Sequence, residues 1–583
     1  MKHIKTLFLT ALATLNFTIS YAQDTTYNPL KNIFPVIQGR AWQSNLQSPY
    51  SRLPLTAKET IREAVWDLSQ NSAGLYIKFR SNANKITIKY TVSQKLSMPH
   101  MPATGVSGLD LYALDNEGKQ RWCAAKFNFS DTITYTYNNL YYTSSAPHNG
   151  YEYTLYLPLY NTVNWLEITT AKNSNFSFLP ISNEKPIVVY GTSIAQGACS
   201  SRPGMAWSNI LERELEYPII NLGFSGNGRL EKEVFDLLAQ IDAKLYIIDC
   251  NPNLSGIYSK EIFDRIVKGI NILRSKNNAP ILLVEHSGYT NDLTCKEAEN
   301  SYRESNKELF KSYEFLKEKN FKDIYYLTKE EIGFNLNSMV EGVHPNDLGM
   351  REYANAYTKK IKGIFKFDTT LTQKFTPCRQ QRDSYNWNER HNEVLALNKT
   401  NPPQIVLIGN SITHFWAGEP SFRIARGEKS WKKLFKGKVV RNMGFGWDRL
   451  ENALWRVNHE ELDGYNAEKI FVLMGTNNLE RDTDDEIIYG LNALLSSIYK
   501  KQPQAQIYVC AILPRKNLEE RIAKLNQRIE SLISNTPMKF VPMHTLLTLP
   551  SGKINPTLFP DGLHPNAEGY KKMGEMMEWA VKE

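Results

Sequence analysis

The sequence is poor in cysteine and contains none of the short motifs that hold metals or nucleotides. Six cysteines are spread over 583 residues without metal-ligand spacing. No HExxH, EF-hand or Walker pattern occurs. Sparse, unclustered cysteines do not require a disulfide framework. The sequence therefore gives no reason to expect a cofactor, a metal ion or a nucleotide.

Long hydrophobic runs and blocks of like charge are also missing from most of the chain. After the N-terminal segment, no apolar run approaches the roughly 20 residues that a membrane-spanning helix needs. The formal net charge of +9 is spread without a basic block, which argues against nucleic-acid binding and leaves a mild preference for anionic partners. We expect no nucleic-acid partner, no membrane anchor and no obligatory protein partner.

The N-terminal segment has the pattern of a secretory signal peptide. Lys2 and Lys5 precede an apolar stretch from Leu7 to Ile19, and Ser20-Tyr21-Ala22 forms a small-residue cleavage pattern. We therefore predict a signal peptide over residues 1–22 and an exported chain, either periplasmic or secreted.

The length of the chain after the signal peptide, and the changes in its hydrophobic pattern, indicate several domains. At 583 residues the chain is too long for one ordinary core. Strict apolar and polar alternation from Leu75 to Val92, repeated from Tyr151 to Ile168, predicts half-buried antiparallel strands. We predict that residues 24–180 form an all-β sandwich.

Short buried apolar runs alternate with helical periods in the rest of the chain. Ile187 to Tyr190 and Ile405 to Ile408 are two such runs. This texture is typical of a parallel sheet covered by helices on both faces. We predict two three-layer α/β domains, at residues 185–366 and 404–583, joined by a polar, proline-containing linker over residues 367–403.

Four short blocks occur in both α/β domains, in the same order. The first copies are Gly191-Thr192-Ser193-Ile194, Asn221-Leu222-Gly223, Asn251-Pro252-Asn253 and Val343-His344-Pro345. The second copies are Gly409-Asn410-Ser411-Ile412, Asn442-Met443-Gly444, Gly475-Thr476-Asn477-Asn478 and Leu563-His564-Pro565. Serine and histidine are 151 residues apart in the first set and 153 in the second. The chain therefore carries two copies of one set of functional motifs.

The residue types in these blocks suit nucleophilic catalysis. Each serine follows a buried strand, where ligands bind at the carboxyl ends of parallel strands and helix N-termini offer amide donors. An alcohol needs a positioned base to attack at neutral pH, and a histidine held by an acid supplies one. We predict two catalytic groups, which are Ser193, His344 and Glu341, and Ser411, His564 and Asp561. The backbone N–H groups of Gly223 and Gly444 are candidate oxyanion donors.

Serine, glycine, asparagine and histidine in this order, each at a strand end, resemble the SGNH hydrolases, also called the GDSL esterase family. Residues 408–416 and 561–566 look like the branch related to platelet-activating-factor acetylhydrolase. Residues 190–197 and 201–204 look like another branch. That branch often carries an N-terminal β domain marked Gly-x-Asp-Leu-Tyr, present here as Gly108-Leu109-Asp110-Leu111-Tyr112.

The resemblance implies a flavodoxin-like fold for both hydrolase domains and an asparagine as a further oxyanion donor. That residue is Asn477 in the second copy. In the first copy the block leaves two choices, and we favour Asn253 because Pro252 has no amide to offer. Two positions depart from the family pattern: Asn410 replaces the aspartate usual before the serine, and Glu341 replaces the usual triad aspartate. Its extra methylene must be absorbed by the loop, so we expect unequal sites.

The resemblance also implies ester hydrolysis through an acyl-enzyme. A secreted chain with two such domains looks like a carbohydrate O-acetylesterase, with O-acetylated sialic acids on glycans as the first expectation and xylan or pectin as the second. Two alternatives stay open. One is a lipase, thioesterase or lysophospholipase acting on longer acyl esters, and the other is a non-catalytic glycan-binding role for one hydrolase domain.

Four aromatic or imidazole side chains near the blocks have competing interpretations. His414 lies one helical turn after the nucleophile and His286 follows a buried strand, and we favour structural roles for both. Trp416 and Trp447 fit sugar-stacking platforms or core packing. For the β domain, we favour a buttress over a glycan-binding module.

Overall fold

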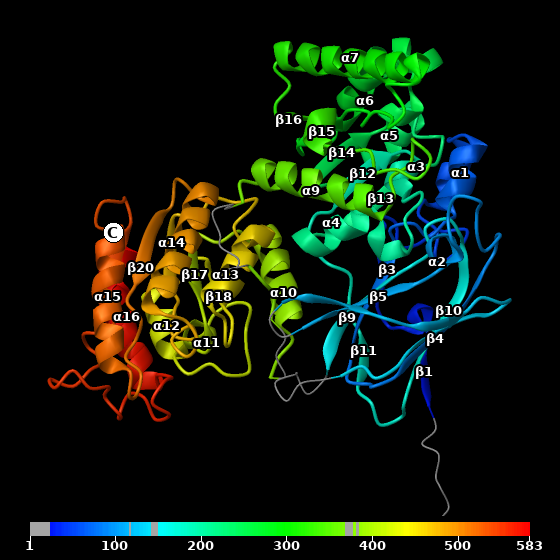
Figure 1. Cartoon of the computed structure of the whole chain (residues 1–583). Helices are drawn as coiled ribbons and strands as arrows, with labels where there is room; N and C mark the ends of the chain where they lie inside the picture. The colour runs from blue at the N-terminus through cyan, green and yellow to red at the C-terminus, as the bar shows by residue number, and fades with distance from the viewer. Residues whose placement is uncertain (1–23, 116–117, 142–149, 368–376, 381–383) are drawn as a thin grey trace, which may run out of the picture.

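The computed structural model describes residues 24–583 except 116–117, 142–149, 368–376 and 381–383. The predicted signal peptide and part of the predicted linker lie outside the described residues. A β domain is followed along the chain by two α/β domains (Figure 1). Within the described part of the chain, no helix is both long enough and apolar enough to cross a membrane.

Two antiparallel sheets pack face to face in the β domain, as the alternating pattern predicts. Ile77 and Phe79 of one sheet share a buried core with Ile86 and Ile88 of the other. The first sheet has the order β1 (Thr25–Tyr27), β10 (Val163–Thr170), β4 (Ile86–Val92), β8 (Ile133–Tyr137), β7 (Lys126–Asn128). The second has the order β11 (Phe176–Phe178), β3 (Tyr76–Ser81), β9 (Tyr151–Tyr156), β5 (Asp110–Leu114), β6 (Gln120–Cys123), with β2 (Ile37–Gln38) beside β3.

One helix inside the predicted sandwich packs on the neighbouring domain instead. The side chains of Val65 and Trp66, on α1 (Glu63–Ser69), are buried in the core of the first α/β domain. Residue 180 is therefore not a clean boundary between the two domains. Alternation identifies the sandwich strands, but it contains no information on which sheet a short helix covers.

The second domain has the expected parallel sheet with helices on both faces. Its strand order is β13 (Ile219–Gly223), β12 (Ile187–Gly191), β14 (Leu245–Asp249), β15 (Ile281–Val284), β16 (Ile324–Leu327). One face is covered by α5 (Lys232–Leu238), α6 (Ile262–Arg274) and α7 (Lys296–Glu318). The other face is covered by α4 (Trp207–Leu215) and α9 (Asp347–Ile364). The chain forms β12 first, adds β13 on one side of it and then continues with β14 on the other side. A ligand site is expected at the carboxyl end of β12, where this change of direction occurs.

The third domain repeats this architecture. Its strand order is β18 (Val440–Gly444), β17 (Ile405–Gly409), β19 (Lys469–Leu473), β20 (Gln506–Cys510), β21 (Lys539–Val541). One face carries α10 (Trp387–Thr400), α13 (Leu450–Arg456), α14 (Asp484–Lys501) and α15 (Glu519–Ile533). The other carries α12 (Glu428–Leu434) and α16 (Ala567–Lys582). The register agrees too, because Gly191 pairs with Gly223 and Gly409 with Gly444.

The linker predicted over residues 367–403 is wrong in its second half, which forms α10. Asn386 caps this helix by accepting the N–H of Glu389. Its buried positions are Trp387, Arg390, His391, Val394 and Asn398. Their spacing is helical, but three of the five side chains are polar, so no apolar period marks the helix in the sequence.

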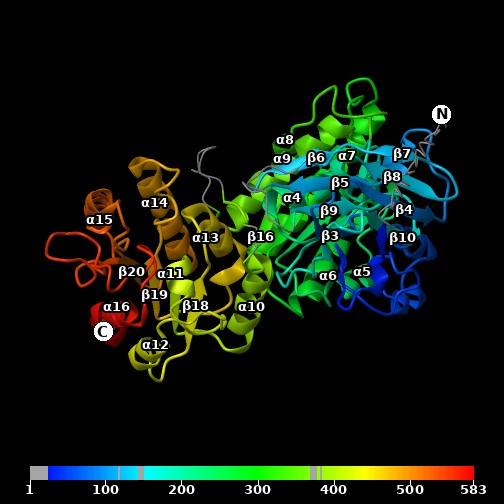
Figure 2. The same cartoon turned by 90° about the horizontal axis from the view of Figure 1, so that it is seen from below.

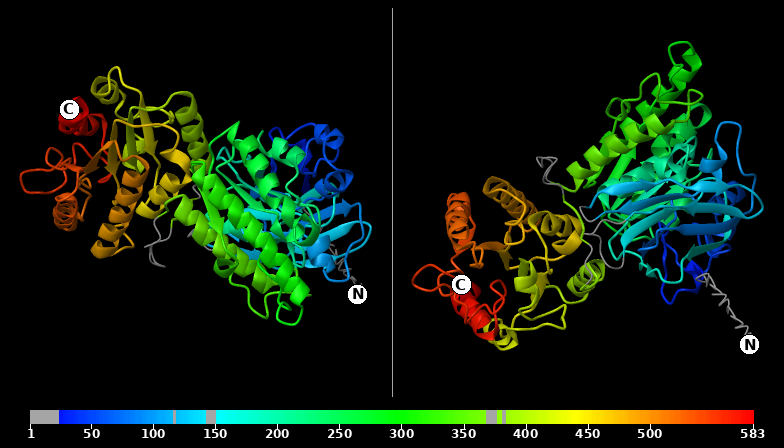
Figure 3. Two further views of the ribbon diagram at one scale, coloured as in Figure 1. Left: turned by 90° about the horizontal axis from the view of Figure 1, so that it is seen from above. Right: turned by 60° about the horizontal axis from the view of Figure 1, so that its bottom comes forward.

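The third domain lies at one end of the molecule and contacts the second domain directly (Figures 2 and 3). The Tyr217 hydroxyl donates to the Asn458 carbonyl at 2.7 Å. Nζ of Lys244 pairs with Asp463 at 2.6 Å. These contacts join the two hydrolase domains through faces remote from the block residues.

Candidate active sites

In the second domain, the structure brings the predicted serine, histidine and acid into contact. Ser193 begins α3 (Ser193–Gln196) just after β12, and its Oγ lies 2.8 Å from Nε2 of His344. Nδ1 of His344 contacts a carboxylate oxygen of Glu341, and the His344 backbone N–H donates to the other oxygen at 3.3 Å. The glutamate therefore reaches the imidazole from the same loop despite its extra methylene.

The third domain has the same arrangement with an aspartate. Ser411 begins α11 (Ser411–His414), and its Oγ lies 2.9 Å from Nε2 of His564. Nδ1 of His564 lies 2.8 Å from Asp561 Oδ2. Partial burial works against ionisation of Asp561, but hydrogen bonds from the His564 backbone and ring and from the Leu563 N–H outweigh it and lower its pKa. The acid is thus kept as a carboxylate that can orient the ring.

Short caps fix the start of each nucleophile helix. Oγ1 of Thr192 accepts the N–H of Ile194 at 3.3 Å. Oδ1 of Asn410 accepts the N–H of Ile412 at 3.0 Å. Asn410 therefore makes a cap bond with its neutral amide in place of the aspartate usual in the family.

An asparagine in each domain holds the block glycine. The N–H of Gly223 donates to Oδ1 of Asn221 at 2.9 Å, and the N–H of Gly444 donates to Oδ1 of Asn442 at 2.8 Å. The two Nδ2 groups donate to carbonyls at the nucleophile helices, at 2.6 Å in the second domain and 2.9 Å in the third. The asparagines therefore join the glycine peptide to the helix that carries the serine. The oxyanion role of both glycines stays a prediction.

Only glycine fits between the strand and the nucleophile helix. A Cβ on Gly223 would lie 2.3 Å from the backbone N of Gln196, and one on Gly444 would lie 2.3 Å from that of His414. No Cβ tolerates such an approach to backbone atoms. This contact explains the residue type independently of any donor role.

The candidate oxyanion asparagines both bind the loop that follows the block glycine. Oδ1 of Asn253 accepts the N–H of Gly228 at 3.1 Å, and Nδ2 of Asn477 donates to the Asp448 carbonyl at 2.9 Å. Asn251 is only 2% exposed and donates to a side chain of α7. This placement favours Asn253 over Asn251, and the donor role of Asn253 and Asn477 stays a prediction.

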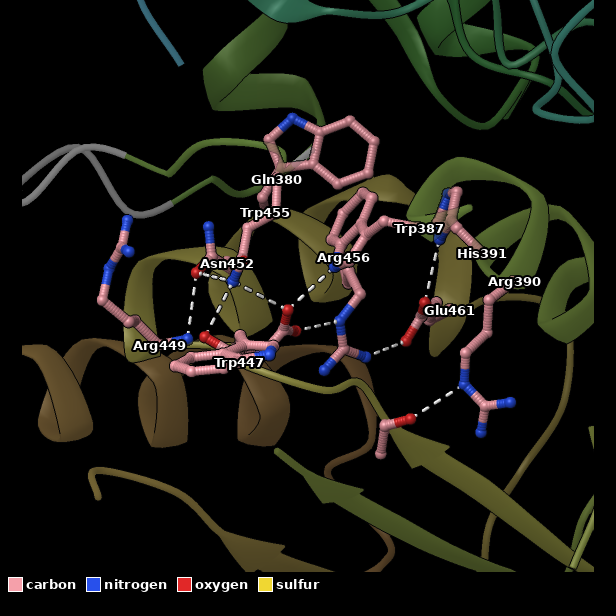
Figure 4. A network of polar contacts seen from close by, with 12 residues as sticks. Gln380, Trp387, Arg390, His391, Trp447, Arg449, Asn452, Trp455, Arg456 and Glu461 are labelled. Atoms are coloured by element: carbon pink, nitrogen blue, oxygen red, sulfur yellow. Dashed lines mark hydrogen bonds and ion pairs between the residues drawn. The ribbon is translucent and has the colours of Figure 1, made fainter. Parts of the chain in front are cut away.

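Two buried arginines bind backbone carbonyls of the strands that end in the block glycines. Neither was predicted from the sequence. Arg52 donates to the carbonyl oxygens of Asn221 and Gly223 at 3.1 and 2.8 Å. Arg390 donates to the matching carbonyls of the third domain at 3.0 and 2.8 Å, and Figure 4 draws one of these bonds. Burial lowers the pKa of Arg52 to about 9 and that of Arg390 to about 10, so both remain cations at neutral pH. They lie 171 and 54 residues before their glycines, and no motif marks either one.

A buried polar network supports the loop after Gly444 in the third domain (Figure 4). Asp448 accepts from Trp387 Nε1 at 2.8 Å and from Arg456 Nε at 2.9 Å. Arg456 also pairs with Glu461, which lies 2.9 Å from Nδ1 of His391. The loop that carries the Asn477 partner is therefore anchored to α10 and α13.

The other candidates divide into structural and exposed residues. His414 and His286 each accept a backbone N–H through Nδ1, at 3.1 and 2.9 Å. Burial lowers their pKa values to about 2 and about 3, so both are neutral structural histidines. Trp416 is 1% exposed and belongs to the core, whereas Trp447 is 60% exposed on the loop after Gly444. Only Trp447 is placed to act as a platform.

One group with metal-type donors overlaps the second-domain site. Donor atoms of Cys199, Glu341 and His344 lie within 4.8 Å of one another, a set that suits zinc chemically. A metal ion there would displace the contact between Glu341 and His344 that orients the imidazole. Burial raises the pKa of the Cys199 thiol to about 12, which also disfavours a thiolate ligand. None of the six cysteines forms a disulfide.

Comparison with known families matches each part of the chain separately. The GDSL-like Lipase/Acylhydrolase family matches residues 184–362, and a second pattern of the same description matches residues 407–572. The N-terminus of Esterase_SGNH_hydro-type matches residues 25–176.

Relatives and solved structures agree with these matches. A GDSL-like lipase from Bacteroides ovatus is 32% identical with a TM-score of 0.54, covering 59% of this chain and 98% of its own. Platelet-activating factor acetylhydrolase IB subunit alpha1 of Bos taurus is 26% identical over 28% of this chain and 67% of its own length. The alpha2 subunit of Homo sapiens is 28% identical over 32% of this chain and 80% of its own length. The chain belongs to the GDSL-like lipase/acylhydrolase family, the SGNH hydrolases, and is a carboxylic ester hydrolase with two hydrolase domains behind an esterase-type β domain.

Proposed function

We propose that the protein is an exported carbohydrate O-acetylesterase. Its preferred substrates are O-acetylated sialic acids on glycans, followed by acetylated xylan or pectin. The observation that carries the esterase function is the contact from serine to histidine to acid, made in both domains at 2.8 and 2.9 Å between Oγ and Nε2. Export rests on the N-terminal signal pattern.

Acylation follows from the position of each imidazole. Nε2 of His344 or His564 takes the hydroxyl proton as the serine Oγ attacks the ester carbonyl carbon. The acid at Nδ1 holds the tautomer with Nε2 unprotonated and stabilises the imidazolium that forms. The tetrahedral intermediate then expels the alcohol, which takes the proton from Nε2, and an acetyl-serine remains.

Deacylation repeats these steps with water. The imidazole removes a proton from water as the water oxygen attacks the acetyl carbon, and the proton returns to the serine Oγ when acetate leaves. The carbonyl oxygen is negative in both intermediates. The proposed donors for it are the N–H of the serine, the amide of Asn253 or Asn477, and the N–H of the block glycine. The glycine N–H donates to Asn221 or Asn442 in this structure, so it must share or leave that bond to reach the oxyanion.

A small ester is favoured by the size of the second-domain cavity. The cavity beside His344 has a volume of about 350 Å³, which lies at the small end of the roughly 300–1,000 Å³ typical of small-molecule sites. One sugar residue as the alcohol portion of the ester suits such a volume.

A preference for anionic sugars is supported by a cation at the third-domain site. Nη1 of Arg426 lies 3.9 Å from Asp561, and its side chain is 36% exposed. The guanidinium also lies over the ring of Phe415, 5.5 Å from its centroid. A guanidinium held beside the triad can bind the carboxylate of a sialic acid through two parallel hydrogen bonds.

Separate serine variants test the function. Ser193→Ala and Ser411→Ala are each expected to remove the turnover of one domain, by on the order of 10³-fold or more. The double variant is expected to release no acetate from O-acetylated sialoglycans or acetylated xylan. Ser551→Ala, at an exposed serine of the third domain, is the matched control. Acetate release that survives in the double variant would disprove the mechanism.

Two further comparisons separate the alternatives. Faster hydrolysis of p-nitrophenyl octanoate than of p-nitrophenyl acetate would replace the acetylesterase with a lipase or thioesterase. If one single-serine variant leaves acetate release unchanged on every substrate, that domain is a binding module.

A further inference from the structure

The cavity beside His344 is built from two domains. Met98 and His100 line it from the N-terminal β domain, and Leu68 lines it from α1, the helix of the N-terminal segment that packs on the hydrolase domain. Ser225, Asn227 and His344 line it from the hydrolase domain. The β domain therefore contributes part of the wall at the reacting end of the site, in addition to any buttressing role.

His100 faces the triad histidine from a fixed turn. The rings of His100 and His344 are inclined by 29°, with their centroids 6.0 Å apart. Met98 and Met101 close the turn through two backbone hydrogen bonds, at 3.0 and 3.1 Å. Met101 is 2% exposed and packs with Ala198 of the hydrolase domain. The turn is thus anchored on both sides of the domain boundary.

Close contacts hold residues 98–105 and Tyr160 of the β domain against residues 193–201 of the hydrolase domain, which include the serine. Oγ1 of Thr104 donates to the Ser201 carbonyl at 2.7 Å. A Cβ on Gly105 would lie 2.2 Å from the Ser200 carbonyl oxygen, so only glycine permits this approach. The Tyr160 hydroxyl donates to the carbonyl of Ser193 itself at 3.2 Å. These contacts fix the backbone segment that carries His100, whose exposed side chain is free to meet a bound substrate.

The reaction indicates which part of the ester lies here. Nε2 of His344 must return its proton to the departing alcohol, so the alcohol oxygen has to come within hydrogen-bond distance of this imidazole. A side chain stacked beside His344 is then close to the alcohol portion of the ester. The wall combines apolar Leu68 and Met98 with polar His100 and Asn227, which suits a ring with both C–H faces and hydroxyl groups.

We propose that Leu68, Met98 and His100 form the subsite for the sugar that leaves as the alcohol, and that His100 determines specificity for it. This inference rests on the proposed esterase function of the second domain. In the third domain the equivalent imidazole is covered from its own domain, because the ring of Phe415 lies 5.3 Å from that of His564. The two domains therefore select different sugars.

The experiment compares sugar leaving groups with nitrophenolate in the full chain with Ser411→Ala, so that only the second domain reacts. The substrates are O-acetylated N-acetylneuraminic acid, acetylated xylo-oligosaccharide and p-nitrophenyl acetate. We expect His100→Ala to lower kcat/KM for an acetylated sugar by on the order of 10-fold. We expect less than about 2-fold change with p-nitrophenyl acetate, because its leaving group has no sugar hydroxyls for His100 to bind. His100→Gln keeps a hydrogen-bonding group and is expected to recover part of the loss.

Lys95→Ala, at an exposed position before the same turn, is the matched control and is expected to behave like the parent. Equal losses on sugar and nitrophenyl esters, no loss on either, or no turnover of any acetylated sugar would overturn the subsite. Ser193→Ala separates this outcome from failure of the function itself. If Ser193→Ala leaves nitrophenyl acetate hydrolysis intact in the Ser411→Ala background, the second domain is not an esterase, whatever His100 does.

Discussion

The two hydrolase domains share a catalytic arrangement but support it with different chemistry. Gly191 pairs with Asp249 at the end of β14, and Gly409 pairs with Leu473 at the matching place on β19. Burial raises the pKa of Asp249 to about 8, although the Tyr357 hydroxyl lowers it. The second domain thus has a buried carboxyl, neutral at acidic and neutral pH, where the third has an aliphatic side chain.

The helix after each triad histidine differs in the same way, with polar side chains in the second domain and apolar ones in the third. Tyr353 and Tyr357 on α9 are buried on the face that carries Asp249. Met573 and Met577, at the same distances after His564, share an apolar cluster with Leu473. The distance from serine Oγ to histidine Nε2 is nearly the same in the two domains, at 2.8 and 2.9 Å. This geometry therefore does not depend on whether the core beneath it is polar or apolar.

The largest expected effect tests whether the two acids are equivalent. Asp561→Asn and Glu341→Gln each replace the carboxylate at Nδ1 with a neutral amide, which no longer stabilises the imidazolium. We expect kcat of the affected domain to fall by on the order of 10³-fold. Each variant is assayed on p-nitrophenyl acetate with the serine of the other domain replaced by alanine. A loss below about 10-fold for Glu341→Gln alone would mean that Glu341 does not act as a triad acid.

Loss of the buried arginines should destabilise both domains alike. Arg52→Met and Arg390→Met leave two glycine-strand carbonyls without donors in a buried setting. We expect each to lower the free energy of unfolding of the hydrolase domain whose glycine strand it holds by about 2–4 kcal/mol. Native-state hydrogen exchange of β13 and β18 measures the two domains separately. Unchanged protection in both strands would contradict the role given to these contacts.

A pH dependence should distinguish the second domain from the third. Between the unfolded pKa of Asp249, about 4, and its folded value of about 8, the folded state binds the extra proton. Stability therefore falls as pH rises through this window, by about 3 kcal/mol from pH 5 to 7, and levels off above it.

Asp249→Asn should remove this slope, because its side chain does not titrate. Hydrogen exchange of β14 at several pH values measures it, and β19 of the third domain serves as the internal reference. An equal slope in β14 of wild type and variant would remove the proposed contribution of Asp249.

The smallest expected effect concerns the exposed tryptophan of the third domain. Trp447→Ala removes a stacking surface of about 1 kcal/mol, so KM for an acetylated sugar should rise about 3- to 10-fold with kcat unchanged. The control is Trp579→Ala, a comparably exposed tryptophan on α16. Equal effects of the two variants would show that Trp447 is not a platform.

The elements that the sequence predicted correctly are those whose periodicity follows from their own burial. Ile187 to Tyr190 and Ile405 to Ile408 are apolar throughout because parallel strands are covered on both faces, and both became strands within one residue of the predicted ends. The helix over residues 387–400 was not predicted, because its buried face contains Arg390, His391 and Asn398, which form hydrogen bonds or ion pairs with other parts of the fold. Local pattern cannot distinguish such a face from a solvated one.

The same limit applied to the sites. The serines, histidines and acids could be named because their types and order are set by the reaction. The residues that hold or surround them, such as Arg52 and His100, could not be named, because they come from segments whose only relation to the site is spatial.

The sequence by itself determined the class of fold, through periodic burial, and which serines, histidines and acids to expect together, through their types and order at strand ends. The ester chemistry came from the resemblance of those blocks to a known family. Tertiary structure alone decided that Glu341 reaches His344, that Asn410 caps the nucleophile helix, and that the β domain lines the cavity beside His344. The physical reason is that hydrogen bonds and cavity walls depend on distances of a few ångströms between segments far apart in the chain, and only close packing sets those distances.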